Sequence, residues 1–88
     1  MDDTVKYARI LRSLPLWLLQ EYLVELGGKL QEDGSVRGNG WKAQISQLDD
    51  FQIGSLKVGQ VHLEVKAASD VVDDLMPALE KKLLRAGG

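Results

Sequence analysis

Two dipeptides in the middle of the chain, Asp33-Gly34 and Asn39-Gly40, constrain the fold most strongly. In each, a residue that tolerates positive φ precedes a glycine, which is the chemistry of a two-residue β-hairpin turn. We therefore expect successive antiparallel strands around them. The expected strands are residues 29–32, 35–37 and 41–48, followed after a break at Asp49-Asp50 by residues 51–66.

Apolar and polar residues alternate along these segments. Near the end of the last one, Val61, Leu63 and Val65 are separated by polar residues, so that one face of the strand points to a core and the other to solvent. Gly54 and Gly59 interrupt the same segment, and we expect a bend or a bulge at each.

An amphipathic helix is expected over residues 15–26. Its leucines recur at three- and four-residue spacing, at Leu16, Leu19, Leu23 and Leu26. Pro15 suits the first turn of a helix, and Gly27-Gly28 supplies the left-handed conformation that ends one.

A second helix begins near Ser69-Asp70 and carries one apolar face. That face consists of Val72, Leu75, Met76, Leu79, Leu83 and Ala86. Pro77 leaves two alternatives: it lies in the first turn if the regular helix starts at Asp74, and it kinks the helix if the start is Asp70.

Residues 4–12 mix β-branched, aromatic and charged residues and predict a first strand. The whole chain of 88 residues is thus expected to form a single α+β domain, residues 1–88, of the order β-α-β(4)-α. One twisted antiparallel sheet with both helices packed on the same face would bury both apolar stripes.

Composition excludes several classes of function. Cysteine is absent, which excludes disulfides, thiolate catalysis and cysteine-based zinc sites and favours a cytoplasmic location. The acidic Met1-Asp2-Asp3 does not fit a signal peptide, and no apolar run approaches the roughly 18 residues of a membrane span. Because 11 basic and 13 acidic residues are interspersed and give a net charge of −2, we expect no binding of nucleic acid.

Four segments, residues 13–28, 38–43, 53–65 and 75–88, resemble the C-terminal domain of bacterial MoaD-related proteins. The resemblance implies a TATA-binding-protein-like fold of the order β-α-β4-α. In such proteins the domain follows a ubiquitin-like sulfur carrier of molybdopterin synthesis, which links this chain to that pathway by association. No catalytic motif comes with the resemblance.

Gly87-Gly88 is the most suggestive candidate site, because sulfur carriers and ubiquitin-like modifiers end in a Gly-Gly whose carboxylate is activated. The competing interpretation is a glycine cap after Ala86. We favour the cap, because ubiquitin-like folds present their tail after a strand and these glycines follow helical turns. A carrier or modifier activated at Gly88 remains the alternative.

Other candidates have simpler explanations. His62 and Glu64 share a strand face, but with no other histidine and no cysteine we expect no metal site there. Asp49-Asp50 suits a turn, and Asp70, Asp73 and Asp74 suit the start of a helix. We therefore expect no catalytic residue, no cofactor and no enzyme activity.

Trp17 and Trp41 are the candidate anchors for a partner, with packing at the core edge as the competing interpretation. Trp17 lies at the edge of the first apolar stripe, and Trp41 opens a strand beside a turn. The sequence as a whole predicts a non-catalytic interaction or binding module. We expect it to act on a protein partner or as a homodimer, through the exposed sheet face or a strand edge.

Overall fold

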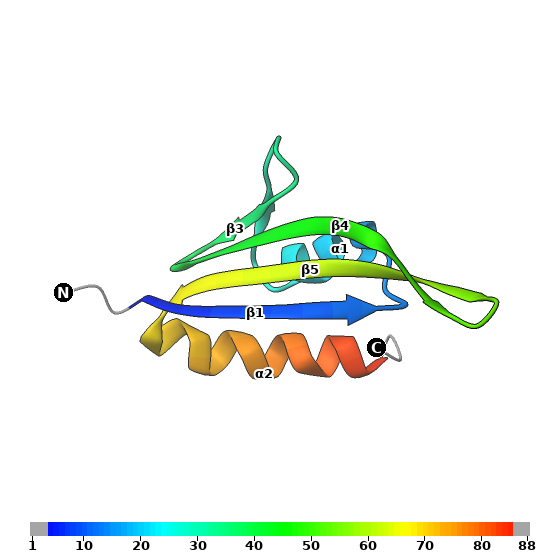
Figure 1. The fold of residues 1–88 in the computed structure, drawn as a ribbon. Coiled ribbons are helices and arrows are strands. Elements are labelled where there is room, and N and C mark those ends of the chain that lie inside the picture. The colour runs from blue at the N-terminus through cyan, green and yellow to red at the C-terminus, as the bar shows by residue number, and fades with distance from the viewer. Residues whose placement is uncertain (1–3, 86–88) are drawn as a thin grey trace.

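A five-stranded antiparallel sheet with two helices forms the described part of the chain. The structure, a computed structural model, describes residues 4–85. Its elements are β1 (Thr4–Arg12), α1 (Leu16–Glu25), β2 (Lys29–Leu30), β3 (Val36–Gly38), β4 (Trp41–Ile53), β5 (Leu56–Ala68) and α2 (Ser69–Arg85) (Figure 1). The predicted order of one strand, one helix, four strands and one helix is confirmed.

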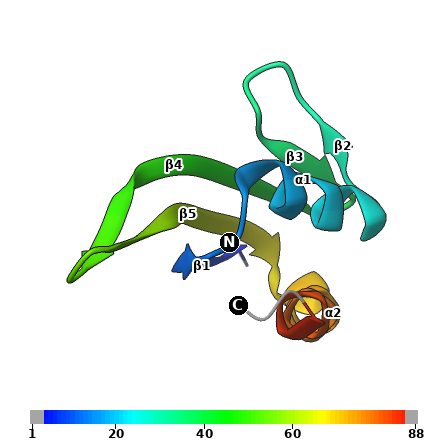
Figure 2. The same cartoon turned by 90° about the vertical axis from the view of Figure 1, so that its right-hand side faces the viewer.

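The strands lie in the order β1-β5-β4-β3-β2, and every neighbouring pair is antiparallel. Both helices lie on one side of the sheet, as Figure 2 shows. One buried cluster joins the two helices to the sheet, as expected from the apolar stripes. Its members are Leu11, Leu14, Leu19, Leu23, Val36, Trp41, Ala43, Val61, Leu63, Val65, Ala67, Leu75, Leu79 and Leu83. The opposite face of the sheet has no helix over it in the described residues, and we call it the open face.

The ends of α1 are close to those expected. Pro15 is extended and precedes the helix instead of lying in its first turn, and its carbonyl accepts hydrogen bonds from the amides of Leu18 and Leu19. Gly27, at φ +102°, ends the helix as predicted, because a residue with a side chain is strained in that conformation.

Of the two Asx-Gly turns, only the second is the expected two-residue hairpin. Gly38 pairs directly with Trp41 across Asn39-Gly40, and Gly40 has the positive φ that this turn needs. The prediction for Asp33-Gly34 was wrong, because residues 31–35 form a five-residue loop closed by a hydrogen bond from the Gln31 amide to the Ser35 carbonyl. β2 is correspondingly shorter than expected, and β3 has the expected three residues but begins one residue later.

Asp49-Asp50 does not end a strand. The ladder between β4 and β5 continues past it with a shift in register between Leu48 and Phe51, which is a β-bulge. The hairpin turn comes later, at Gly54-Ser55, where Gly54 has a φ of +59° and Ile53 pairs with Leu56. A bend at Gly54 was predicted, but its role as the turn between two long strands was not.

Helix α2 starts at Ser69 and contains Pro77 in its interior, so the alternative start at Asp74 was wrong. A proline there lacks the amide that would bond to the carbonyl of Asp73, and the apolar packing of the helix compensates for that loss. Within residues 4–85, no helix is long and apolar enough to cross a membrane.

Candidate binding site

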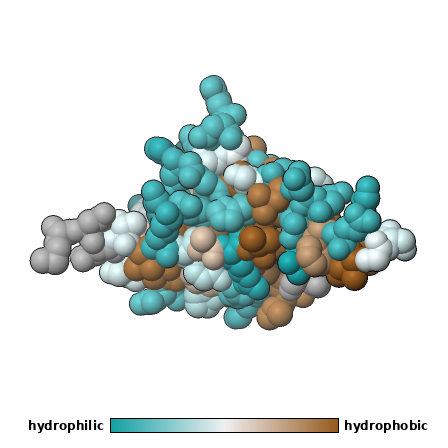
Figure 3. All heavy atoms as spheres, in the orientation of Figure 1, coloured by the Kyte–Doolittle hydropathy of each residue, from teal (hydrophilic) through white to brown (hydrophobic). Residues whose placement is uncertain are grey.

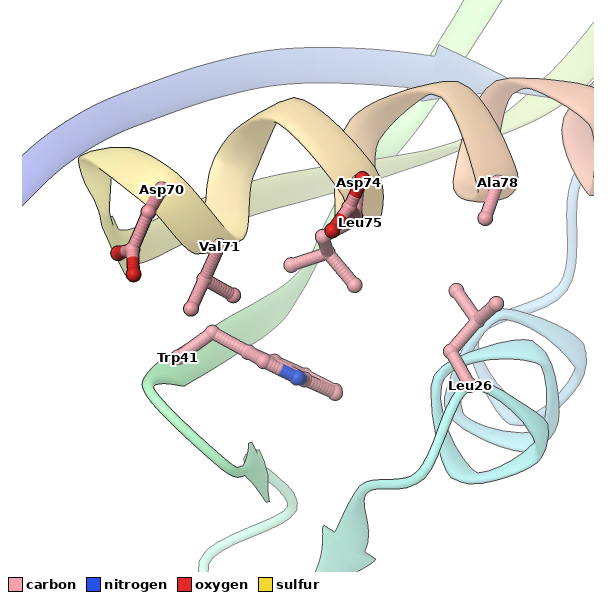
Figure 4. Close-up of a pocket in the computed structure, with 7 residues that line it drawn as sticks. All are labelled: Leu26, Trp41, Asp70, Val71, Asp74, Leu75 and Ala78. Carbon is pink, nitrogen blue, oxygen red and sulfur yellow. The ribbon is translucent and has the colours of Figure 1, made fainter.

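A cavity of about 350 Å³ lies where the first half of α2 passes over the start of β4 and the end of α1 (Figure 4). Three elements that are distant in sequence converge on it. The residues that line it are Leu26, Trp41, Asp70, Val71, Asp74, Leu75 and Ala78.

The indole of Trp41 forms the floor of this cavity. A Cβ atom placed on Gly28 or Gly38 would overlap the Trp41 ring, so these two glycines leave the space that the ring occupies. Val71 and Leu75 point from α2 towards the same ring (Figure 4). Trp41 is only 8% exposed, so it contributes to the core and offers a partner little surface. Whether it anchors a partner stays a prediction.

Two carboxylates stand at the rim of the cavity. Asp70 and Asp74 lie four residues apart, on one face of α2, and both are exposed. A general acid or base is usually a carboxylate held in a desolvated cleft, which these two are not. An apolar floor with an acidic rim instead suits an apolar or aromatic group that carries a positive charge.

The outward face of α1 is the second candidate surface. Seven of its ten residues are apolar or aromatic, but only Leu19 and Leu23 are buried. Trp17 is 62% exposed and Val24 is 43% exposed. Trp17 and Val24 lie seven positions apart, which places them on the same face of the helix. The structure thus places one of the two predicted anchors, Trp17, on an exposed apolar face.

The remaining sequence candidates do not converge. His62 and Glu64 are half-buried on the open face, and within residues 4–85 no three histidine or acidic side chains lie close enough to hold a metal ion. Asp49 and Asp50 are exposed in the bulge of β4.

The predicted tail, Gly87-Gly88, lies outside the described residues, as does the proposed cap after Ala86.

Within residues 4–85, two side chains have shifted pKa values, and both lie away from the cavity. The pKa of Asp33 is lowered, chiefly because the Ser35 hydroxyl donates a hydrogen bond to its carboxylate and then because the Ser35 amide does the same. The pKa of Arg9 is raised, chiefly by its hydrogen bond to Glu80. Each shift arises from a bond that closes a loop or joins two elements, and both are structural.

Comparison with known protein families shows what the chain is similar to. The model of the archaeal MoaD-like protein family matches residues 7–88, which is nearly the whole chain. The chain belongs to the archaeal MoaD-like family. No curated protein matches it. The sequence resemblance to MoaD-related proteins is thereby confirmed at the level of a MoaD-like family, and the finer assignment to the C-terminal domain of the bacterial proteins stays a prediction.

For this MoaD-like chain, the sequence did not reveal the cavity. Trp41, Asp70 and Asp74 were each noted for a separate reason, and their convergence depends on how α2 packs against the start of β4. The two glycines that make room for the indole were the available signal. Gly28 precedes β2 and Gly38 ends β3, and only Gly38 leads into a turn, so turn formation does not account for both glycines.

Proposed function

We propose that this archaeal MoaD-like protein is a non-catalytic interaction module that binds a partner protein through the outward face of α1. The observation that carries the proposal is the mismatch between composition and burial in that helix. A surface helix of a lone globular protein usually has one apolar stripe and one polar face, whereas α1 has apolar residues on both sides. An apolar helix face left in solvent is typical of a surface that another protein covers.

Trp17 is the side chain with most to contribute to such contact. Tryptophan is enriched at the energetic centre of protein interfaces, because it combines a large apolar area with few rotatable bonds. Trp17 and Val24 would form the apolar centre of the interface, and the exposed Glu21 between them would lie within it or at its rim.

The test is co-purification of the tagged full chain from its native cells, comparing Trp17→Ala with Leu56→Ala. Leu56 is a matched control, because it is also 62% exposed but lies at the tip of the β4–β5 hairpin. We expect Trp17→Ala to lose a partner that both the wild type and Leu56→Ala retain. Equal retention by both variants would refute the role of α1. Sedimentation of the purified proteins separates a heterologous partner from a homodimer.

A second candidate function is a sulfur carrier or protein modifier that is activated at Gly88. The family match favours it, because the match extends to Gly88 and the family is named for its likeness to MoaD. The order β-α-β-β-β-β-α argues against it, because a helix, not a strand, leads to the final glycines. Mass spectrometry of the protein isolated from its native cells tests this candidate: a thiocarboxylate or adenylate at Gly88 would support it.

A further inference from the structure

Five cationic side chains form one row across the whole sheet. The register pairs Lys6 of β1 with Lys66 of β5, and Lys66 with Lys42 of β4. It then pairs Lys42 with Arg37 of β3, and Arg37 with Lys29 of β2. Each strand of the sheet therefore contributes one cation at the same level. We call these five residues the cation row.

All five side chains belong to the open face. Directly opposed residues in an antiparallel ladder point to the same side, and successive residues along a strand point to opposite sides. Val65 and Ala67, on either side of Lys66, are buried in the core. Lys66 and the residues paired with it consequently point away from the helices. Figure 3 shows that the surface on the viewer's side of Figure 1, where the sheet lies in front of α1, is largely hydrophilic.

The row is long and accessible. Neighbouring strands lie about 4.8 Å apart, so five strands place the first and last cation roughly 19 Å apart. Four of the five side chains are exposed, and Lys42 is half-buried. No anion of a few atoms could contact the full row, and a partner that fills it must be an extended one.

Few carboxylates neutralise the row. Lys6 has an ion pair with Glu64, at 3.7 Å, and the other four cations have no ion pair with any described residue. The charge of Lys42 helps to lower the pKa of Asp33, which makes Asp33 the second carboxylate near the row. Among the described residues, five positive charges thus face two negative ones, on a chain whose net charge is −2.

Directly opposed like charges weaken a sheet, so the row is a cost to the fold that an anionic partner would relieve. We propose that the cation row binds an acidic segment of a partner protein that lies across the strands. An α-helix with a carboxylate on each turn repeats every 5.4 Å, which is close to the strand spacing of about 4.8 Å and within reach of flexible lysine side chains.

Nucleic acid fits the row less well than an acidic protein segment does. A phosphate backbone that lies across the strands carries its charge far beyond the roughly 19 Å of the row, and it would also meet Glu64, which is ion-paired with Lys6. At physiological salt, electrostatic interactions are screened beyond about 8 Å. A short acidic segment bound to the row is therefore attracted by its cations and is little repelled by the acidic residues elsewhere on this protein.

This inference is independent of the proposed role of α1. Trp17 lies on the helix side of the sheet and the cation row lies on the open face. Loss of one interaction leaves the other intact, and a partner could engage either surface alone.

The test measures binding of the purified full chain to fluorescein-labelled poly-L-glutamate by fluorescence anisotropy, over a range of salt concentrations. The row variant replaces Arg37, Lys42 and Lys66 by glutamine. The control variant replaces Lys57, Lys81 and Arg85, three exposed cations outside the row, by glutamine. Both variants remove three positive charges, so they differ only in where the charge is lost.

We expect the row variant to bind poly-L-glutamate about tenfold more weakly than the control variant, because three of the five cations of the row no longer contact the polymer. A thermal midpoint of the row variant at or above that of the wild type shows that the variant is folded. Equal affinities of the two variants would overturn the proposal. Tighter binding of single-stranded or duplex DNA than of poly-L-glutamate would also overturn it, as would self-association that the row variant abolishes.

Discussion

The guanidinium of Arg9 donates a 2.5 Å hydrogen bond to the carboxylate of Glu80 and so ties β1 to α2. Tyr7, also in β1, donates a longer bond of 3.5 Å to the same carboxylate. Both residues point towards the helices, as do the core residues opposite them in β5. An edge strand and the final helix are thereby joined by a charged bond at the margin of an apolar interface.

Replacing Glu80 by glutamine should lower the free energy of unfolding by about 0.5–1 kcal/mol, because the pair is partly exposed and solvent screens it. The raised pKa of Arg9 means that its contribution is complete below the ordinary arginine pKa and is lost only as the pH rises beyond it. Urea unfolding at neutral pH measures the effect. Glu21→Gln, on the exposed side of α1, is the control, and an equal loss in both variants would mean that the bond to Arg9 contributes nothing.

Gly38→Ala should lower the free energy of unfolding by about 1–3 kcal/mol, because its Cβ would overlap the indole of Trp41 and force the ring from the cavity floor. Gly59→Ala is the matched control, since nothing lies within 4 Å of a Cβ there and its φ is not positive. In a Trp17→Phe background, a red shift of the tryptophan emission in Gly38→Ala reports the displaced ring. An unchanged emission and stability would contradict the packing of Trp41 on Gly38.

Ser13 has a φ of +65°, the only positive value for a residue other than glycine in the described part of the chain. Left-handed backbone costs such a residue roughly 1 kcal/mol, and glycine avoids that cost while gaining freedom in the unfolded chain. Ser13→Gly should therefore leave the thermal midpoint unchanged or raise it. Ser13→Val should lower it, because β-branched residues tolerate this conformation poorly. The opposite ranking of the two variants would contradict the left-handed link between β1 and α1.

Ser35→Ala should make the free energy of unfolding depend less on pH in the acidic range. The lowered pKa of Asp33 means that this carboxylate stabilises the fold above its ordinary pKa of about 3.9, and that the contribution disappears as the pH falls through the lowered value. Removing the Ser35 hydroxyl should move the pKa of Asp33 back up, so that wild type and variant differ most near neutral pH and least in acid. Carboxyl NMR titration measures the pKa directly. An unshifted pKa in the variant would show that the Ser35 hydroxyl does not cause the shift.

Lys66→Gln should raise the free energy of unfolding, because Lys66 is opposed on both sides by a lysine. Relief of each like-charge pair is worth about 0.2–1 kcal/mol. Lys57→Gln, in the hairpin, has no cation directly opposite and should change stability little. The difference should shrink in high salt, which screens exposed charges. Destabilisation by Lys66→Gln at low salt would contradict the placement of the five cations in one row.

Much of the fold follows from local chemistry. Gly27 and Ser69 mark helix ends that depend on neighbouring residues alone, and they were predicted. The Asp49-Asp50 bulge was missed because β5 runs alongside and pairs with both of its flanks, so that tertiary pairing overrides a local break signal. The position of Pro77 within the second helix was left open. It depends on whether the apolar packing of α2 outweighs one missing hydrogen bond, and that packing is a tertiary interaction.

The candidate sites were less predictable. The exposure of Trp17 follows from its place at the edge of an apolar stripe, which the sequence indicates. The cation row depends on the register of four strand pairs, and only the pairing of Gly38 with Trp41 could be inferred, from the Asn39-Gly40 turn. With that turn alone, Arg37 can be placed opposite Lys42, but the other three cations cannot be aligned with them.

The central claim is that this MoaD-like chain acts by binding through its folded surface and not through an activated tail. Co-purification from native cells of the wild type, Trp17→Ala and a chain lacking Gly87 and Gly88 tests it most directly. The account predicts that the shortened chain keeps its partner and that Trp17→Ala loses it. Loss of the partner on removal of the two glycines, with retention by Trp17→Ala, would contradict the account and favour a carrier.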